Sequence, residues 1–454
     1  MAFDDQSVLN LLNTIEKDKT IGGVCGRTFP IGIHRHPVVW LQMFDYAKDF
    51  WMIKSAQNII GSVMCCPGCF SLYRFEAIDD IIDTFSMPTE SMTDVFTKDN
   101  GEDRWMCTLM MKAGWSLRYS YHGNNTTFCP EETEEFMKQR RRWLLSDFAN
   151  AAVVAWNLLP LMKNNTAFTL VYTLYLLQLF IVTILYPGST VLMLALGFEL
   201  VTDCPLLVNA AFLSLICLVY CIVQISSWNT YKKLIVSKLL IIVMGILTTY
   251  VFGATSVFLI QMLIKDIGLG FVTSHIANLV LLGVVFLYLY SLLLHPFDIH
   301  LILAGIQKAS VPRILRLPKF KKRKKSMNRS NSYESLSSSA IDLQEVSEDE
   351  TLFWQSLVTD SIGAGVKTGL TPEQRTKGLR SLRNRALAGY LTVNMLWVAV
   401  LTGFYAFLTK FFTDKLVYGV IVLTLLGISA IIQILGMTVY RCSDMLTRFG
   451  RLIS

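Results

Sequence analysis

Residues 139–186 read QRRRWLLSDFANAAVVAWNLLPLMKNNTAFTLVYTLYLLQLFIVTILY, and this stretch joins two kinds of sequence. Its first part belongs to a predicted amphipathic helix at residues 131–161, with arginines 140–142 on one side and aromatic residues among the apolar positions. Such a pattern is typical of a helix lying in a membrane interface. Residues 166–186 are almost entirely apolar and can cross a hydrocarbon layer of about 30 Å. The stretch therefore predicts a membrane protein with a water-exposed part ahead of its first span.

The composition of the whole chain agrees with this prediction. Of its 454 residues, 53% are hydrophobic and 17% are charged, and the apolar residues gather in long runs. The run at 189–201 is too short to cross a membrane, so we expect a re-entrant segment or half-helix there. We predict six full crossings, which place the basic clusters on the cytosolic side: residues 166–186, 205–226, 234–263, 274–294, 386–408 and 416–440.

The segment before the spans has the pattern of an α/β domain. Helices are predicted at residues 38–50, 53–60 and 104–113, and short strands at 62–64, 69–72 and 116–121. The predicted organisation is an α/β domain at 1–130, the interface helix at 131–161, a transmembrane cluster at 162–306, a linker at 307–379 and two further transmembrane helices at 380–454. The linker is basic, then rich in serine, then acidic, a composition typical of disorder.

Charge and cysteine usage indicate where the soluble part resides. The net charge is +7, and a basic cluster lies at residues 319–325. Beside membrane spans such a cluster marks the cytoplasmic face, so we expect a lipid bilayer as partner and no nucleic acid. The first ten residues are polar and acidic, without a secretory signal. We therefore expect the first half to lie in the cytosol, with its cysteines reduced.

Two short motifs carry residues suited to group transfer. Residues 101–105 read GEDRW and residues 139–143 read QRRRW. A carboxylate can remove a proton from an acceptor hydroxyl, and a guanidinium binds a departing diphosphate bidentately. An adjacent aromatic ring can stack on a sugar. Each motif alone has a simpler interpretation, the first as a helix N-cap and the second as a topology signal.

Together the motifs resemble those of processive inverting glycosyltransferases, the group that includes cellulose, hyaluronan and chitin synthases. Residues 66–74, CPGCFSLYR, narrow the resemblance to chitin synthases. The metazoan type fits best, because residues 24–27 (VCGR) and 40–46 (WLQMFDY) are similar to stretches preceding its CPGCFS segment. The similarity runs through most of residues 1–306 and resumes at about 345–454.

This resemblance implies a partial glycosyltransferase-A-like domain followed by an all-α transmembrane bundle. It also implies UDP-N-acetylglucosamine as donor, a chitin oligomer as acceptor, and a multi-pass plasma-membrane protein whose catalytic part faces the cytosol. Asp103 would be the general base and Glu102 would support it, while Gln139, Arg142 and Trp143 would hold the diphosphate and line the channel entry. The wall beside the acceptor sugar would be formed by Cys66, Pro67, Gly68, Cys69, Phe70 and Ser71.

The resemblance also implies a divalent metal, Mg²⁺ or Mn²⁺, held in the intact enzymes by a D-x-D motif. No D-x-D occurs in this chain, so we predict no metal ligands in it. Cys66 and Cys69 form a C-x-x-C, but a zinc site needs a second pair at suitable spacing, and a tight turn at Pro67 and Gly68 is the favoured interpretation.

Three explanations remain open for the missing D-x-D. The chain is a fragment of a full synthase, a short paralogue without catalysis, or one partner of another chain that supplies the donor module. We therefore expect little or no synthase activity from it alone, and a homo-oligomer or a full-length synthase as a possible partner. A transporter or channel is a rival of another class, but the predicted span interiors hold almost no ionisable residues.

Overall fold

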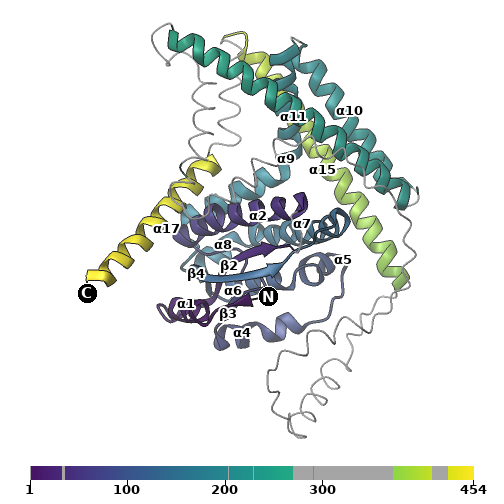
Figure 1. Ribbon diagram of the computed structural model, residues 1–454. Helices are drawn as coiled ribbons and strands as arrows, with labels where there is room; N and C mark the ends of the chain where they lie inside the picture. The colour runs from purple at the N-terminus through teal and green to yellow at the C-terminus, as the bar shows by residue number, and fades with distance from the viewer. Residues whose placement is uncertain are drawn as a thin grey trace.

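A computed structural model of the chain describes residues 2–32, 36–202, 204–226, 228, 230–268, 290, 372–411 and 428–453. The predicted span at 274–294 and most of the predicted linker lie outside the described residues, apart from Tyr290 and the stretch from residue 372. A curled sheet with surrounding helices forms one part of the molecule, and long helices extend from it (Figure 1). The α/β part and the helical part that the sequence predicts are therefore both present.

The sheet has four strands in the order β1-β4-β2-β3. Its strands are β1 (Ala2–Phe3), β2 (Ile21–Ile31), β3 (Ser71–Tyr73) and β4 (Ser116–Phe128). The central pair, β2 and β4, is parallel, and the two edge strands pair antiparallel to their neighbours. At Gly26 a side chain would collide with the Phe70 ring, so glycine allows β2 to approach the segment before β3.

The strand predictions are partly wrong. Residues 62–64 form no strand, because this segment meets β4 at a single residue: Val63 N–H donates to the carbonyl of Leu117 at 3.0 Å, and the Ser62 hydroxyl accepts from Leu117 N–H at 2.8 Å. Strand β3 begins two residues later than expected, β4 runs seven residues further, to Phe128, and the buried strand β2 was not predicted.

Helices cover the sheet; most of them share one main core with it, while the first two along the chain bury their apolar residues in smaller separate clusters. They are α1 (Asp5–Ile15), α2 (Pro37–Lys48), the π-helical turn η1 (Asp49–Lys54), α3 (Ser55–Ile60), α4 (Phe75–Ser86), α5 (Met92–Asp94), the π-helical turn η2 (Val95–Asp99), α6 (Glu102–Lys112), α7 (Thr133–Trp156) and α8 (Leu158–Asn164). The predicted helix at 131–161 is thus two helices, α7 and α8, with a bend of 69° between them.

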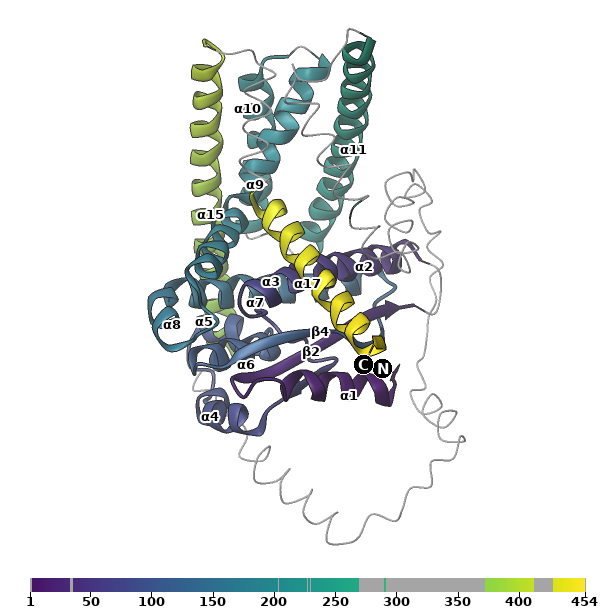
Figure 2. The same ribbon diagram turned by 90° about the vertical axis from the view of Figure 1, so that its left-hand side faces the viewer.

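Above this part rise four long helices: α9 (Leu170–Thr202), α10 (Leu206–Ile225), α11 (Thr230–Gly268) and α15 (Pro372–Leu408). Figure 2 shows them extending side by side from the α/β part. Within the described residues three helices are long and apolar enough to cross a membrane, or four if the bent pair α7–α8 counts as one span. The three lie at Leu170–Glu199, Leu206–Ile225 and Thr376–Leu408, and they coincide with three predicted crossings.

Helix α9 does not stop at Pro187, which corrects the prediction of a separate segment at 189–201. Proline lacks the N–H that would bond to the carbonyl of Thr183. The hydroxyl of Tyr390 on α15 donates to that carbonyl at 3.0 Å. On the next residue, Gly188 N–H donates to Asn394 Oδ1 at 2.7 Å, and Asn394 Nδ2 donates to Ile184 O at 2.9 Å. Polar side chains of α15 thus satisfy the backbone that the proline disturbs.

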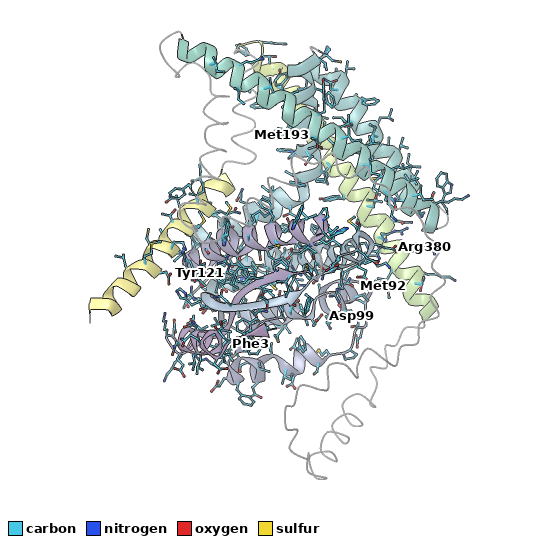
Figure 3. All side chains as sticks on the ribbon, viewed as in Figure 1. Phe3, Met92, Asp99, Tyr121, Met193 and Arg380 are labelled. Atoms are coloured by element: carbon cyan, nitrogen blue, oxygen red, sulfur yellow. The ribbon has the colours of Figure 1, made fainter. Side chains whose placement is uncertain are left out.

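The last helix, α17 (Ile428–Ile453), differs from the predicted span at 416–440. It packs on α3 and η1 of the α/β part, and it runs diagonally across that part in Figure 2. Gly436 lies so close to Ala56 that a Cβ atom would come within 2.6 Å of the alanine Cβ. The Tyr440 hydroxyl donates to Tyr119 O at 3.1 Å and accepts from the N–H of Tyr121, which lies beside α17 in Figure 3.

Helix α15 also links the two parts of the molecule. Its first turns lie beside α5, where Gly378 packs on the side chain of Met92, and its later turns pack on α9 and α10. Figure 3 shows Met92 of α5 near Arg380 of α15. A segment that begins 170 residues after the end of α9 therefore holds the bundle to the α/β part.

Candidate functional site

The acidic motif occupies the start of α6. Glu102 is exposed at the first helical position, and Asp103 beside it is half-buried. One carboxylate oxygen of Asp103, Oδ2, accepts from Gly68 N–H at 3.3 Å and lies 3.8 Å from the Cys65 thiol. The structure thus brings Asp103 to the segment that the sequence assigned to the acceptor wall.

That wall is a tight turn, as the sequence predicts for Pro67 and Gly68. Phe70 N–H donates to Pro67 O at 3.3 Å, and the Ser71 hydroxyl donates to the same oxygen at 2.7 Å. The two cysteines of the C-x-x-C face different neighbours: Cys66 N–H donates to Cys107 Sγ at 3.2 Å, whereas Cys69 Sγ lies 3.2 Å from the Thr28 hydroxyl.

A buried lysine fixes the chain at the entry to this turn. Lys54 Nζ donates to Cys65 O at 2.8 Å and lies 3.6 Å from Asp49 Oδ2. Burial disfavours the charged form of Lys54 and is the largest single effect on it, but the Asp49 carboxylate and the thiols of Cys25, Cys65 and Cys66 together raise the pKa of Lys54 above its ordinary value. Lys54 therefore holds the turn as a charged anchor. Lys54 is not among the site residues predicted from the sequence.

Helices α6 and α7 are joined along one face. Arg104 Nε donates to Asp147 Oδ1 at 2.8 Å. One turn further, the Thr108 hydroxyl donates to Asn150 Oδ1 at 3.0 Å, and Asn150 Nδ2 donates to Thr97 O at 3.1 Å. These contacts hold the acidic motif against the helix that carries QRRRW. In the sequence, the signal for these contacts between α6 and α7 is a set of polar residues at helical spacing in an otherwise apolar stretch.

The side chains of QRRRW point in different directions. Arg140 turns inward, with its guanidinium carbon 4.9 Å from the Trp143 ring and 5.0 Å from the Phe136 ring. Phe136, Arg140 and Trp143 share one helix face, because they are spaced four and three residues apart. The expectation that arginines 140–142 all lie on the polar side of the helix is therefore wrong for Arg140. Arg142 is exposed, and no direct contact joins it to Asp103 in the described part of the chain.

Aromatic rings and buried polar atoms pack on the inner side of this motif. The rings of Tyr46 and Trp143 lie 6.3 Å apart. Gln139 Oε1 and two nitrogens of Arg140 are buried there without hydrogen-bond partners. Tyr46 also lines a cavity of about 240 Å³ between α2 and the last residues of β2. These polar atoms of Gln139 and Arg140 have almost no exposed surface, and Arg140 Nη2 lies 3.8 Å from Asp45 Oδ2, so it is the rings of Tyr46 and Trp143 that can offer a face to a sugar.

The described residues do not fit a metal site. No group of three His, Cys, Asp or Glu side chains among them converges as metal ligands do. Asp4, the acid nearest to where the family's metal ligands are expected, caps α1 instead: Asp4 Oδ1 accepts from Ser7 N–H at 2.8 Å, and hydrogen bonding with Ser7 lowers the pKa of Asp4. We therefore derive no step through a metal.

Comparison with known proteins identifies the family. The sequence profile of a family described as chitin synthase matches residues 2–236, a range that holds the sheet, both motifs and the first two predicted spans. The chain belongs to the chitin synthase family. Its turn at Cys66, its acidic helix α6 and its QRRRW helix α7 are thus parts of one chitin synthase region.

Individual proteins similar to this chain are also chitin synthases. Chitin synthase chs-2 of Caenorhabditis elegans is 30% identical over 305 residues, which is 67% of this chain and 18% of that protein. A chitin synthase of Meloidogyne artiellia is 29% identical over 317 residues, 68% of this chain and 16% of that protein. Chitin synthase chs-1 of C. elegans is 35% identical over 194 residues, 42% of this chain and 14% of that protein. The chain therefore spans less than a fifth of each of these chitin synthases.

Proposed function

We propose that this chain forms the acceptor-binding and membrane-passage half of a chitin synthase. The complete enzyme transfers N-acetylglucosamine from UDP-N-acetylglucosamine to a growing β-1,4 chain on the cytosolic side of the plasma membrane. The observation that supports the proposal is the contact of Asp103 with Gly68, because it joins the proposed base to the turn proposed as the acceptor wall.

The proposed chemistry is an inverting transfer. The 4-hydroxyl of the acceptor attacks the anomeric carbon of the donor, and the bond from that carbon to the diphosphate oxygen breaks, leaving UDP. The hydroxyl proton passes to Asp103, with the exposed Glu102 next to it. Arg142, which is also exposed, has a guanidinium that can bind the departing diphosphate. Trp143 with Tyr46 offers a ring surface for the sugar.

Acceptor binding is the first test. The purified full chain in lipid nanodiscs is titrated calorimetrically with N-acetylchitotetraose, with cellotetraose as the comparison sugar. We expect binding of the acetamido sugar and a loss of about tenfold in affinity, or about 1.4 kcal/mol, in Trp143→Ala. Trp156 lies on the same helix but is 90% exposed, so Trp156→Ala is the matched control. Equal affinities for the native chain and Trp143→Ala would contradict the proposal.

Transfer is the second test. Because no D-x-D is present in the sequence, we expect little or no UDP release from UDP-N-acetylglucosamine by this chain alone. Release that Asp103→Asn abolishes would contradict that expectation, while supporting Asp103 as the base. The same substitution should leave N-acetylchitotetraose binding within about twofold of the native chain, because the rings of Tyr46 and Trp143 are unchanged.

A second candidate is a non-catalytic membrane partner of a longer synthase, favoured by the same lack of a D-x-D. It predicts stable co-purification with that synthase and no acceptor binding of its own. A transporter has less support, because the carboxylate of Glu199 already accepts from Leu206 N–H at 3.1 Å and from the Tyr405 hydroxyl at 3.0 Å. This carboxylate therefore joins three helices at the end of the bundle.

A further inference from the structure

Three cationic side chains come together where α10 ends and α11 begins. Lys233 Nζ donates to Gln224 O at 2.7 Å and to Ser226 O at 2.5 Å. Arg383 of α15 donates from its guanidinium to the same Gln224 oxygen at 3.3 Å, so the two cations meet at one carbonyl. Arg380 lies three residues before Arg383 and shares its face of α15. Desolvation and the nearby charges of Arg383 and Arg380 lower the pKa of Lys233, as expected for cations held close together.

The positive charge of this Lys233 cluster, namely Lys233, Arg380 and Arg383, is not balanced by acidic side chains. In the part of the chain that the structure describes, none of the three forms an ion pair with a carboxylate. Their acceptors, the Gln224 carbonyl and the amide oxygen of Asn384, which accepts from Arg383 at 2.8 Å, are neutral. Both arginines are exposed. An anionic group can therefore reach the cluster and form charge-assisted hydrogen bonds with it.

An apolar groove between α10 and α11 adjoins the Lys233 cluster. It has a volume of about 290 Å³ and is lined by Leu215, Ile216, Val219, Tyr220, Val236 and Leu240. Tyr220 lies four residues before Gln224 on α10. Val236 likewise lies three residues after Lys233 on α11, so the groove continues along the helix faces that carry the cluster. Gln224 Nε2 donates to Ser237 Oγ at 3.0 Å and holds the two helices together at this end.

The position of the cluster fits the layer of lipid headgroups. Gly378, two residues before Arg380, packs on Met92 of α5, so this end of the bundle faces the α/β part; Figure 3 shows Arg380 near Met92. Trp228, in the link between α10 and α11, is 52% exposed, and tryptophan favours the boundary between headgroups and hydrocarbon. With the α/β part in the cytosol, the cluster lies at the inner leaflet, whose lipids carry negative charge.

We propose that an anionic phospholipid binds at this end of the bundle, with its phosphate at the Lys233 cluster and one acyl chain in the groove between α10 and α11. The phosphate oxygens accept hydrogen bonds from the ammonium and guanidinium groups. The acyl chain fills the groove by van der Waals packing, and a soluble phosphate has no part that could do so. This site does not rest on the proposed function, since it uses residues of the helical bundle alone.

Native mass spectrometry of the full chain in detergent tests the charged part of the site. We expect phosphatidylserine to bind about tenfold more tightly than phosphatidylcholine, whose choline offsets the phosphate charge. Arg380→Gln combined with Arg383→Gln should weaken phosphatidylserine binding about tenfold, because two of the three cations are lost. Lys233 is kept in this variant because it caps α10. Lys163→Gln combined with Lys410→Gln removes the same charge from exposed positions elsewhere and should leave binding unchanged.

The groove is tested by filling it. Val236→Trp places a large ring among the lining residues, and we expect about tenfold weaker phosphatidylserine binding. Leu239→Trp is the control, because Leu239 lies on the same helix, is 57% exposed and does not line the groove. Millimolar inorganic phosphate should not displace the lipid, because it lacks the acyl chain.

The following outcomes would overturn the lipid site. They are equal affinities for phosphatidylserine and phosphatidylcholine, or native affinity in an arginine double variant that unfolds at the native temperature. Arg380→Gln alone, at an exposed position, replaces the double variant if that one fails to fold. Displacement by inorganic phosphate, with no effect of Val236→Trp, would assign the cluster to a soluble anion. Lipid binding that appears only after the acids of residues 345–350 (EVSEDE) are changed to amides would assign it to that segment.

Discussion

Arg104 Nε lies 2.8 Å from Asp147 Oδ1, and this ion pair joins the acidic helix α6 to the QRRRW helix α7. Arg104 is mostly buried, with 19% of its side chain exposed, whereas Asp147 is 64% exposed. The pair therefore positions two motifs relative to each other without adding much stability, since exposed ion pairs contribute little.

Asp147→Asn tests that distinction. We expect the free energy of unfolding to fall by about 0.5 kcal/mol, because the carboxylate is largely hydrated. The affinity for N-acetylchitotetraose should fall further, because α6 and α7 lose their charged connection. Thermal unfolding and calorimetry measure the two effects. Lys138→Met removes a charge from the exposed ion pair with Glu134 on the same helix and serves as control. A fall in stability without a fall in affinity would contradict a positioning role.

Gly101→Ala tests how closely α6 and α7 approach. A Cβ atom at position 101 would contact the Ser146 hydroxyl and lie 2.8 Å from Ser146 Cβ. We expect a loss of about 1–3 kcal/mol in stability from overpacking, measured by denaturant unfolding. Ser146→Gly in the same chain should restore part of that loss. Gly245→Ala is the control, because its added Cβ would meet no atom within 4 Å. If Gly101→Ala lowers the stability equally in the native chain and in the Ser146→Gly chain, the contact between positions 101 and 146 is contradicted.

Asn394→Leu tests the polar support of α9 at Pro187. The substitution leaves Gly188 N–H and Ile184 O without the side-chain partners that they have in the native bundle. We expect a loss of about 1–3 kcal/mol, measured as the midpoint of thermal unfolding in detergent.

The loss should shrink when Asn394→Leu is combined with Pro187→Ala, because alanine restores a backbone N–H and lets the helix satisfy itself. Thr392→Val provides the control on the exposed side of α15. Additive effects of the two substitutions at 394 and 187 would show that the two residues act independently.

Gly436→Ala tests whether α17 docks on α3 in solution. The added Cβ would come within 2.6 Å of Ala56 Cβ, and the backbone of Ala56 leaves no room for adjustment. We expect faster hydrogen exchange throughout the described part of α17, by about tenfold or more if docking weakens by about 1.4 kcal/mol. Gly403→Ala, whose Cβ would meet no atom within 4 Å, should leave exchange unchanged. Unchanged exchange in Gly436→Ala would contradict the docked position.

Local sequence was enough to predict much of the architecture. Runs of apolar residues predicted that the segments at 170–199, 206–225 and 376–408 cross a membrane, because crossing a hydrocarbon layer is a property of one segment alone. The span at 206–225 agrees with the prediction to within one residue at each end, whereas the span at 170–199 continues thirteen residues beyond its predicted end and the span at 376–408 begins ten residues before its predicted start. The GEDRW and CPGCFS motifs predicted the family and the neighbourhood of Asp103 and Gly68. Helix propensity likewise predicted α6 and α7, apart from the break after Trp156.

Tertiary structure decided which side chains found partners. Nothing local to α9 shows that Asn394 would satisfy its backbone, whereas the sequence predicted a span ending at residue 186 and a separate segment at 189–201. Arg140 turned inward only because Phe136, Trp143 and Tyr46 assemble an aromatic site around it. The residues from 428 onward are apolar enough to resemble a span, yet they dock on α3 because Gly436 permits close approach. The spacing of apolar residues predicts which face of a segment is buried. Which other segment covers that face depends on contacts between residues far apart in the chain.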